Sequence, residues 1–233
     1  MCNLYRLAPK SDLERYLLSH SPSLVLPNWP EKDMVGPFET GVVLVSDGKG
    51  GLAGRTAQWG MIRPGQAGRI EYKERPSTKP GGTPRKEPLL TNCVRLGSIA
   101  KLPAFKESGA VGGRCLIPAS WLAEPNWETG QCLWWNLSRA DGLPWMIAGL
   151  WSEWTDPETA EIVPNFAFIT FNVNDHPVLS RLHRPEIDPV SNEPLPLEHQ
   201  DKQGEAHIAP EHWHTWLSGN GQDATSLLAP PET

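Results

Sequence analysis

The second residue of the chain, Cys2, has a residue type and a position that together predict an unusual nucleophile. Methionine is normally removed when the next side chain is small, so we expect the mature chain to begin with Cys2. Its α-amine would then have a pKa of about 7.7 to 8.0 and its thiol one of about 8.5. A 1,2-aminothiol condenses with an aldehyde to an imine, which the sulfur closes to a thiazolidine ring. The alternative is a frayed terminus with an accidental cysteine.

Several short blocks of sequence accompany this residue in a fixed order. They are Met1–Tyr5, Trp59–Met61, Thr91–Asn92, Arg114–Pro118, Ala123–Pro125, Ala148–Trp151 and Leu182–Pro185. In this order the chain resembles the SOS response-associated peptidase family, the abasic-site processing proteins, over essentially its whole length. The resemblance implies a single α+β domain on a β-barrel-like sheet, with a cleft for single-stranded DNA. Family members crosslink to the aldehyde of an abasic site through the N-terminal cysteine.

The resemblance also implies roles for four side chains. Cys2 is the expected nucleophile, Asn92 orients its amine, Glu124 is the acid–base carboxylate and His183 is a second proton-transfer group. An abasic sugar is mostly a closed hemiacetal, so ring opening needs a proton donor and a base. Glu124 follows an apolar strand, where desolvation raises a carboxyl pKa towards neutrality. An imidazole such as His183 titrates near neutral pH without tuning.

Two arginines are predicted to hold DNA phosphate, and one of them departs from the family pattern. The family commonly has an arginine two residues after the asparagine, whereas Cys93 and Val94 both separate Asn92 from Arg95. An extra residue on a strand reverses the side-chain direction unless a bulge absorbs it. The second departure follows His183, where residues 184–206 form a polar, proline-rich insertion. We expect Arg184 still to reach phosphate.

Tryptophan is unusually frequent, with eleven residues in the chain. Most should be core aromatics, and a minority could stack on nucleobases. The stacking candidates are Trp29, Trp59, Trp121 and Trp127, of which we assign Trp59 and Trp127 to DNA binding. Trp127 lies in a turn beside Asn126 and Glu128 and should be the most exposed of the four.

The charge balance limits the type of nucleic-acid binding. Lys and Arg number 21 against 27 Asp and Glu, a net charge of −6, which excludes a uniformly basic coat. Residues 63–86 contain seven basic residues but only Glu71 and Glu74 as acids, so this segment is +5 and the rest is −11. We predict a flexible basic loop here, which is either a solvated connector or an electrostatic arm for DNA.

The elements that must position these residues are mostly short strands. Gly 21 plus Pro 24 favours many strands and long loops over a helical bundle. Apolar runs predict strands at 42–46, 58–61, 114–118, 131–137, 145–154 and 165–173. Three helices are expected: one opened by a Ser11–Glu14 capping box, one after Asp175 through Leu182, and one over 210–217. The predicted fold is a single α+β domain over 1–233, with a mainly antiparallel β-barrel-like sheet, short flanking helices and a tail at 220–233.

Cofactor, metal and membrane sites are not predicted. The four cysteines are widely separated, and the histidines His199, His207, His212 and His214 lack paired ligands in zinc spacing. No run of about eighteen apolar residues exists and no signal peptide precedes the cysteines, so we expect a cytoplasmic, nucleoid-associated monomer with reduced thiols. No Gly-x-Ser-x-Gly motif supports a serine hydrolase.

Three functions remain open from the sequence. The first is a DNA-damage protein that crosslinks abasic sites in single-stranded DNA and could also act as a lyase at the imine stage. The second is a thiol peptidase or autoproteolytic hydrolase in which Cys2 attacks a carbonyl. The third is a non-catalytic single-strand binding module.

Overall fold

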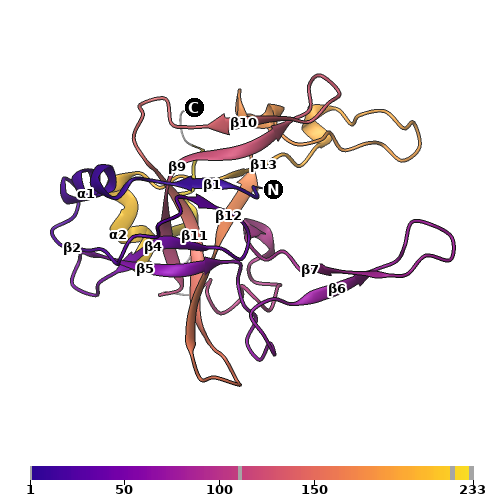
Figure 1. Cartoon of the computed structure of the whole chain (residues 1–233). Coiled ribbons are helices and arrows are strands. Elements are labelled where there is room, and N and C mark those ends of the chain that lie inside the picture. Colours follow the sequence, from indigo (N-terminus) through magenta and orange to yellow (C-terminus); the bar gives the residue numbers. More distant parts are fainter. Residues whose placement is uncertain (1, 110–111, 221–223, 231–233) are drawn as a thin grey trace.

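Thirteen strands and two α-helices make up the described part of the computed structural model, residues 2–109, 112–220 and 224–230 (Figure 1). The strands are β1 Tyr5–Leu7, β2 Leu24–Val25, β3 Met34–Val35, β4 Thr40–Ser46, β5 Leu52–Trp59, β6 Tyr72–Arg75, β7 Arg85–Pro88, β8 Cys93–Arg95, β9 Arg114–Asn126, β10 Leu133–Leu137, β11 Trp145–Thr155, β12 Ile162–Asn172 and β13 Gln203–Glu205. The helices are α1 Lys10–Leu18 and α2 Trp213–Ser218, with short 3₁₀ helices at Leu96–Ser98, Leu179–Arg181, Leu197–His199 and Pro210–His212. Met1, and residues 221–223 and 231–233 of the expected tail, lie outside the described residues.

Five strands close a barrel at the centre of this structure. They pair in the order β11, β12, β5, β4 and β9, and β9 pairs again with β11. Only the β5–β12 contact within this ring is parallel, and the other four are antiparallel. The predicted α+β fold with a mainly antiparallel, barrel-like sheet is therefore confirmed.

Strand β9 is bent so that its two halves have different partners. Its first half, from Arg114 to Ala119, pairs with β11, and its second half, from Leu122 onwards, pairs with β10. Along β1 the register with β9 shifts between Arg6 and Leu7, which leaves Ser120 without a partner in that ladder. Such a bulge bends a strand and increases its twist. The second half of β9, which carries Glu124, is thereby directed away from the barrel wall and towards the amino-terminal end of the chain.

Two apolar clusters fill the two sides of the barrel wall. One contains Tyr5, Trp59, Phe166 and Phe168 in the interior, and the other lies under α1 and α2. The helices bury the faces that contain Leu13, Tyr16 and Leu17 in α1 and Trp213, Trp216 and Leu217 in α2. Both helices lie on the side of the barrel opposite the β6–β7 hairpin (Figure 1). The helices therefore complete the hydrophobic core rather than the candidate site.

The first helix forms as predicted but begins differently. Pro9, not Ser11, is its N-cap, and no side chain caps it. The backbone N–H of Leu13 donates to the Pro9 carbonyl at 3.0 Å, and the ring of Pro9 fixes its φ at −57°. The predicted capping box is wrong because Pro9 starts the helix before Ser11. The predicted buried face of Leu13, Tyr16 and Leu17 is confirmed.

The helix expected between Asp175 and Leu182 is replaced by a single 3₁₀ turn, Leu179–Arg181. The His176 ring accepts the backbone N–H groups of Val178 and Leu179 at 3.2 and 3.0 Å, so this side chain takes the place of backbone carbonyls. Leu182 is extended and forms a bridge with Asn126 of β9. The tertiary contact with β9 overrides the local helical tendency. The helix predicted at 210–217 is present as Pro210–His212 followed by α2.

Residues 63–86 contain regular structure that the sequence reading missed. Strands β6 and β7 form a separate two-stranded sheet that extends away from the barrel (Figure 1). Lys73 faces Glu87 and Glu74 faces Lys86 across the strands. Cross-strand pairs of opposite charge stabilise a hairpin that lacks an apolar face. The same pattern of charges that indicated a loop therefore supports a hairpin.

The described residues include no helix that is long and apolar enough to cross a membrane.

Gly149 tests how tightly the barrel wall is packed. A Cβ on this residue of β11 would lie 2.2 Å from Ile117 Cδ1, 2.8 Å from the Ala167 carbonyl oxygen and 3.0 Å from Cys115 Sγ. We expect Gly149→Ala to lower the free energy of unfolding by about 1–3 kcal/mol because the wall must shift. Urea unfolding followed by tryptophan fluorescence measures this. Gly97→Ala is the control, since a Cβ there meets nothing within 4 Å; equal stability of the two variants would contradict the prediction.

Candidate functional site

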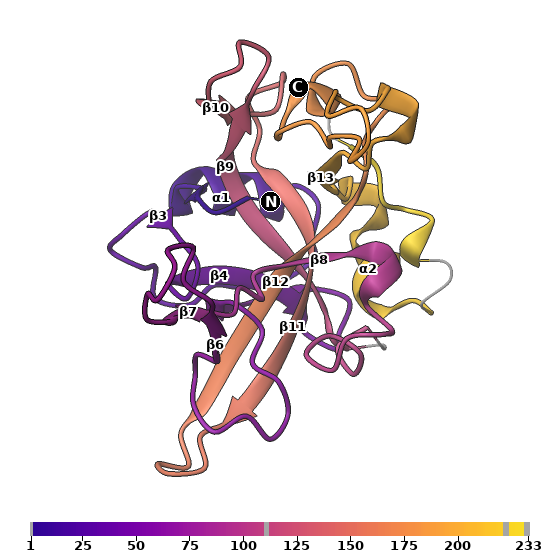
Figure 2. The same ribbon diagram turned by 90° about the vertical axis from the view of Figure 1, so that its right-hand side faces the viewer.

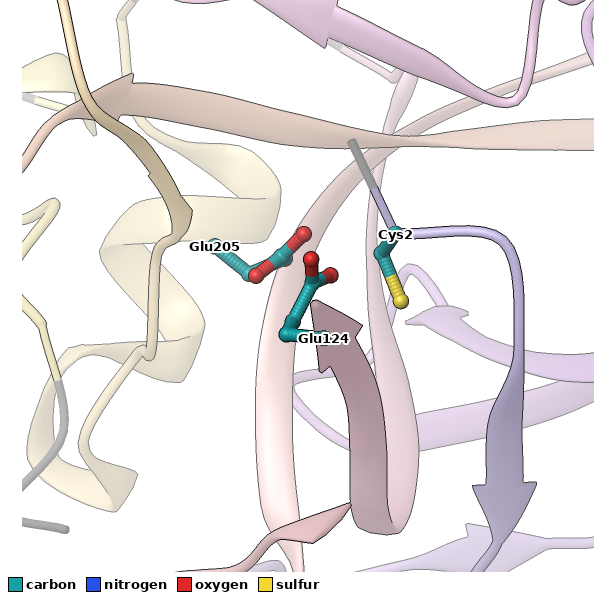
Figure 3. Close-up of side chains that lie close together, drawn as sticks. All are labelled: Cys2, Glu124 and Glu205. Atoms are coloured by element: carbon teal, nitrogen blue, oxygen red, sulfur yellow. The ribbon is translucent and has the colours of Figure 1, made fainter. Parts of the chain in front are cut away.

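Three acidic side chains from distant parts of the chain meet at one end of the barrel (Figure 3). Their ligand atoms, the Cys2 thiol and one carboxylate oxygen each of Glu124 and Glu205, lie within 4.8 Å of one another, and all three residues are buried. Cys2 precedes β1, Glu124 is in the second half of β9, and Glu205 ends β13. In Figure 2 the amino-terminal end of the chain lies between the β6–β7 hairpin and the segment 184–206. The site is therefore assembled by the fold rather than by a local motif.

Asn92 fixes the backbone of Cys2. Its side-chain Nδ2 donates to the Cys2 carbonyl at 2.9 Å. The carbonyl of Asn92 in turn accepts hydrogen bonds from the Trp59 indole and from the Phe168 backbone, both at 2.9 Å. These bonds hold Asn92 immediately before β8 with its amide directed at Cys2. The resemblance implied that Asn92 orients the Cys2 amine, and the contact in the structure is made to the Cys2 carbonyl.

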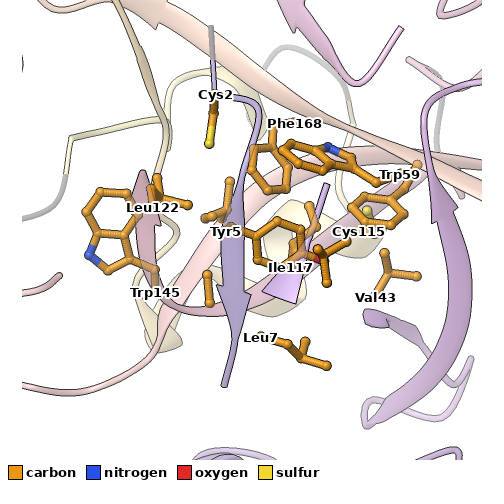
Figure 4. Close-up of a cluster of buried hydrophobic side chains, with 14 of the residues drawn as sticks. Cys2, Tyr5, Leu7, Val43, Trp59, Cys115, Ile117, Leu122, Trp145 and Phe168 are labelled. Carbon is orange, nitrogen blue, oxygen red and sulfur yellow. The ribbon is translucent and has the colours of Figure 1, made fainter. Parts of the chain in front are cut away.

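Burial controls the chemistry of the Cys2 thiol. Cys2 is fully buried and lies at one end of the apolar cluster that includes Tyr5 and Leu122 (Figure 4). Its thiol donates to the Leu4 carbonyl at 3.3 Å. Burial, followed by the nearby charges of Glu124 and Glu205, raises the pKa of this thiol well above its ordinary value. The thiol therefore keeps its proton at neutral pH and needs a neighbouring base to act as a nucleophile.

Glu124 is a buried carboxyl that holds a proton. Leu122 and Glu124 lie two residues apart on β9, so both side chains face the same side of the strand. Neither carboxylate oxygen has a hydrogen-bond partner of ordinary geometry among the described residues. Burial, and then the charge of Glu205, raises the pKa of Glu124 well above its usual range. The prediction that desolvation raises this pKa agrees with the structure, and the shift favours the protonated carboxyl, which can act as a proton donor.

His183 lies beside Glu124 but is neutral. Its Nε2 is 3.4 Å from Glu124 Oε2 and 3.1 Å from the Gln203 carbonyl oxygen. Burial lowers the pKa of His183 to about 4, so the expectation that it titrates near neutral pH without tuning is wrong. Because a carbonyl only accepts hydrogen bonds, Nε2 is the protonated nitrogen of the neutral ring. His183 is thus a hydrogen-bond donor directed towards Gln203 and Glu124.

Lys202, which the sequence pattern did not indicate as a site residue, supports the backbone around His183. His183 has a positive φ of 61°, and its backbone N–H donates to the Pro125 carbonyl at 2.7 Å. The buried Lys202 Nζ donates to the carbonyls of Leu182 and His183 at 2.7 and 2.9 Å. This ammonium satisfies two carbonyls in an unusual turn, which places the imidazole beside β9.

The extra residue between Asn92 and Arg95 does not turn Arg95 away from the site. Cys93 and Arg95 alternate with the buried Val94 along β8, so they share a face. The Cys93 thiol lies 3.6 Å from the Cys2 carbonyl, and Asn92 contacts the same carbonyl from the position before β8. The additional residue is absorbed where the strand begins. Arg95 is exposed and pairs with Asp201 through Nη1 and Oδ2 at 2.6 Å.

The two tryptophans assigned to DNA binding differ in exposure. Trp59 is fully buried and its indole N–H donates to Asn92, so its prediction as a stacking surface is wrong and its role is structural. Trp127 is half-buried, with the Arg184 guanidinium 5.5 Å from its ring centre. Trp134 on β10 is 58% exposed, and its place in an apolar run gave no sign of this exposure. A position in a turn, the reason for selecting Trp127, does not indicate Trp134, which lies on a strand beside Pro125 of β9.

Ion pairs neutralise much of the basic segment 63–86. Arg63 pairs with Glu71 at 3.1 Å, Arg69 with Glu161 at 2.5 Å, and both Arg75 and Arg85 with Glu87. Glu87 lies one residue beyond the segment and Glu161 far from it in sequence, so the count of +5 did not include them. The segment is consequently less positive than its own residues indicated.

The donor set of the site gives little basis for a metal. Cys2, Glu124 and Glu205 offer one thiol and two carboxyls, a mixture between the sulfur and imidazole ligands of structural zinc and the oxygen ligands of magnesium or calcium. His207, one of the four histidines considered, contacts Arg139 instead and is buried elsewhere in the fold. Protons suffice to neutralise the cluster.

Lys202 can be tested by removing its ammonium. We expect Lys202→Met to lower the free energy of unfolding by about 1–3 kcal/mol, because two buried carbonyls lose their donor. Thermal and urea unfolding measure this. Lys106→Met changes an exposed lysine in the same way, and a decrease no larger than in this control would show that Lys202 does not support the His183 turn.

Comparison with known proteins agrees with this architecture. A protein from Bordetella bronchiseptica has a solved structure with a TM-score of 0.72 and 22% identity, over 98% of this chain and 94% of that chain. A protein from Bacteroides thetaiotaomicron gives a TM-score of 0.64 at 16% identity, over 100% and 88% of the two chains. A phage-related protein from Bordetella bronchiseptica gives 0.58 at 14% identity, over 99% and 90%. At these identities the likeness concerns the fold alone.

The sequence itself places the chain in a family. A search of curated proteins finds no match. The family model of the SOS response associated peptidases (SRAP) matches residues 1–233, which is the whole chain. The chain therefore belongs to the SOS response associated peptidase family.

Proposed function

We propose that this protein captures abasic sites in single-stranded DNA as a covalent thiazolidine adduct of Cys2. Membership of an SOS-response family supports a role in the DNA damage response. The observation that carries the proposal is the contact set around Cys2. Its carbonyl is held by Asn92, its thiol lies within 4.8 Å of a carboxylate oxygen of Glu124, and His183 lies against Glu124. A structural cysteine would not need acids beside it.

The reaction would need the amine of Cys2 to be free, so whatever precedes this residue is first removed. The abasic sugar opens from hemiacetal to aldehyde by a proton transfer from its hydroxyl to the ring oxygen. The amine then adds to the aldehyde carbon, and loss of water gives the imine. In the last step the sulfur bonds to the imine carbon, the C=N bond becomes single, and the thiol proton passes to nitrogen. One water leaves in total.

The surroundings of Cys2 suit this sequence of steps. The protonated Glu124 can donate to the ring oxygen and to the departing water. Asn92 fixes the Cys2 carbonyl, which orients the adjacent amine. The neutral His183 ring lies 3.4 Å from Glu124 and can support that carboxyl as it gives up and regains its proton. A lyase activity would follow from the same imine if a proton next to it were removed before ring closure.

Arg95 and Arg184 are proposed to hold the DNA backbone on the outer side of the site. Arg95 shares a face of β8 with Cys93, which contacts the Cys2 carbonyl. Arg184 directly follows His183 and covers the ring of Trp127. In DNA binding, phosphate would replace Asp201 as the partner of Arg95. Trp127 and the exposed Trp134 offer ring faces to unpaired bases.

The Cys2 proposal is tested with an oligonucleotide that contains one abasic site. We expect the processed protein to give a denaturation-resistant band, and Cys2→Ala and a chain with an uncleaved amino-terminal tag to give none. Cys132→Ala is the matched control, since Cys132 is exposed and free. A band of unchanged intensity in Cys2→Ala would refute the role of this residue.

The same preparations separate the alternative functions. Intact mass shows which residues are lost before Cys2, and loss of more than one residue together with turnover of a peptide substrate would favour a thiol peptidase. Equal affinity for intact and abasic oligonucleotides with no adduct would favour a non-catalytic binding module.

The phosphate role of Arg95 predicts a change in salt dependence. Each neutralised phosphate of single-stranded DNA contributes about 0.7 to the slope of log affinity against log salt concentration. We expect Arg95→Gln to lower that slope by about this amount, measured by fluorescence anisotropy with an oligonucleotide that lacks an abasic site. Lys101→Gln removes one exposed charge as a control. An unchanged slope in Arg95→Gln would show that Arg95 makes no phosphate contact.

A further inference from the structure

Glu205 is a buried carboxyl whose position needs an explanation. It is 3% exposed and ends β13, which pairs with β12 through Thr170. This strand lies at the end of the segment 184–206, which the sequence analysis treated as a polar insertion. Burial of an ionised carboxylate is costly unless the group is partnered or protonated. A residue that only terminated an insertion would not need to bring an acid to the thiol of Cys2.

Glu205 and Glu124 are near enough to influence each other directly. Their carboxylate oxygens and the Cys2 sulfur lie within 4.8 Å of one another, and Figure 3 shows the two carboxyl groups directed towards each other. Two carboxylates at such a separation do not both ionise easily, so the pair retains one proton. Burial raises the pKa of both groups, and the charge of Glu205 raises that of Glu124 further. Contact with Glu124 acts in the opposite direction on the pKa of Glu205, which favours Glu124 as the protonated member of the pair.

We propose that Glu205 is a second acid–base group of the site, which accepts protons while Glu124 donates them. The inference rests on the proposed crosslinking function and adds the acceptor that this function lacks. His183 cannot accept through Nε2, because that nitrogen already carries the hydrogen directed at the Gln203 carbonyl. Glu205 has a carboxylate oxygen within 4.8 Å of both the Cys2 sulfur and a Glu124 oxygen, so it is placed to accept a proton while Glu124 carries one.

A pair that shares one proton fits every step of the adduct chemistry. In ring opening, Glu205 takes the hydroxyl proton and Glu124 gives one to the ring oxygen. In imine formation, Glu205 takes the proton that the nitrogen loses, and Glu124 gives a proton to the oxygen that leaves as water. In ring closure, the thiol loses its proton to one carboxylate and the nitrogen gains one from the other carboxyl. Each step takes one proton and returns one, so the pair ends with the single proton it began with.

The pH dependence of crosslinking tests this role. Glu205→Gln keeps the size of the side chain but cannot accept a proton, and we expect its single-turnover rate to fall by about 10²-fold. The charge of Glu205 raises the pKa of Glu124, so its removal lowers that pKa. Glu124 then loses its proton at lower pH. The crosslinking rate, which falls on the alkaline side as Glu124 deprotonates, should therefore fall at a lower pH than in wild type. Glu205→Asp keeps a carboxylate and should recover part of the rate.

The control is Glu198→Gln, an exposed glutamate in the same segment. A merely structural role for Glu205 would reduce the yield of folded protein without moving the pH limb. If wild type crosslinks and Glu205→Gln matches it in rate and pH profile, the inference is wrong while the proposed function stands. If wild type does not crosslink, the proposed function fails on its own.

Infrared spectroscopy tests the shared proton without any reaction. Wild type at neutral pH should show a protonated-carboxyl band that is absent in Glu124→Gln, and its titration midpoint should move to lower pH in Glu205→Gln. Absence of that band in wild type would overturn the inference. Crosslinking should also persist in EDTA; its loss would assign the three groups to a metal ion instead of a proton pair.

Discussion

The structure depends on the burial of three acids within 4.8 Å of one another. A thiol and two carboxyls in an apolar environment can be accommodated only if they keep most of their protons. Burial therefore makes Glu124 a proton donor and leaves Cys2 a thiol rather than a thiolate. A protonated thiol is a much weaker nucleophile than a thiolate. Under the proposed function, the thiol would react only when a substrate supplies an electrophilic carbon and a neighbouring carboxylate accepts the proton.

The barrel brings these groups together because their positions along the chain are far apart. The bulge in β9 directs Glu124 towards Cys2, and the parallel pairing of β8 with β12 places Asn92 behind it. The bridge between Leu182 and Asn126 sets His183 against the same strand. Each contact joins segments separated by 50 residues or more in the sequence. A local change in any one of these strands would therefore alter the site as a whole.

The sequence was sufficient to predict the longer strands from their apolar runs, and the resemblance of its motif blocks indicated the barrel-like fold and the contacts of Cys2 with Asn92 and Glu124. It was insufficient where tertiary contacts decide. Trp59 has the appearance of a stacking residue but is fixed by its bond to Asn92. The helix before His183 is lost to the bridge with β9. Glu205 was missed because a short strand at the end of a polar insertion has no periodicity, and its burial follows only from pairing with β12.

The segment 184–206, which was expected to be a polar insertion, contributes three groups to the site and its surroundings. Lys202 supports the turn at His183, Glu205 joins the acid pair, and Asp201 neutralises Arg95. The Arg95–Asp201 pair is one place where the acidic balance of the chain, a net charge of −6, bears on the proposed binding of DNA. If Arg95 binds phosphate as proposed, the phosphate must displace the Asp201 carboxylate, so DNA would gain little from electrostatics alone. Selection would then depend on the step that intact DNA cannot perform, which is reaction of an aldehyde with Cys2.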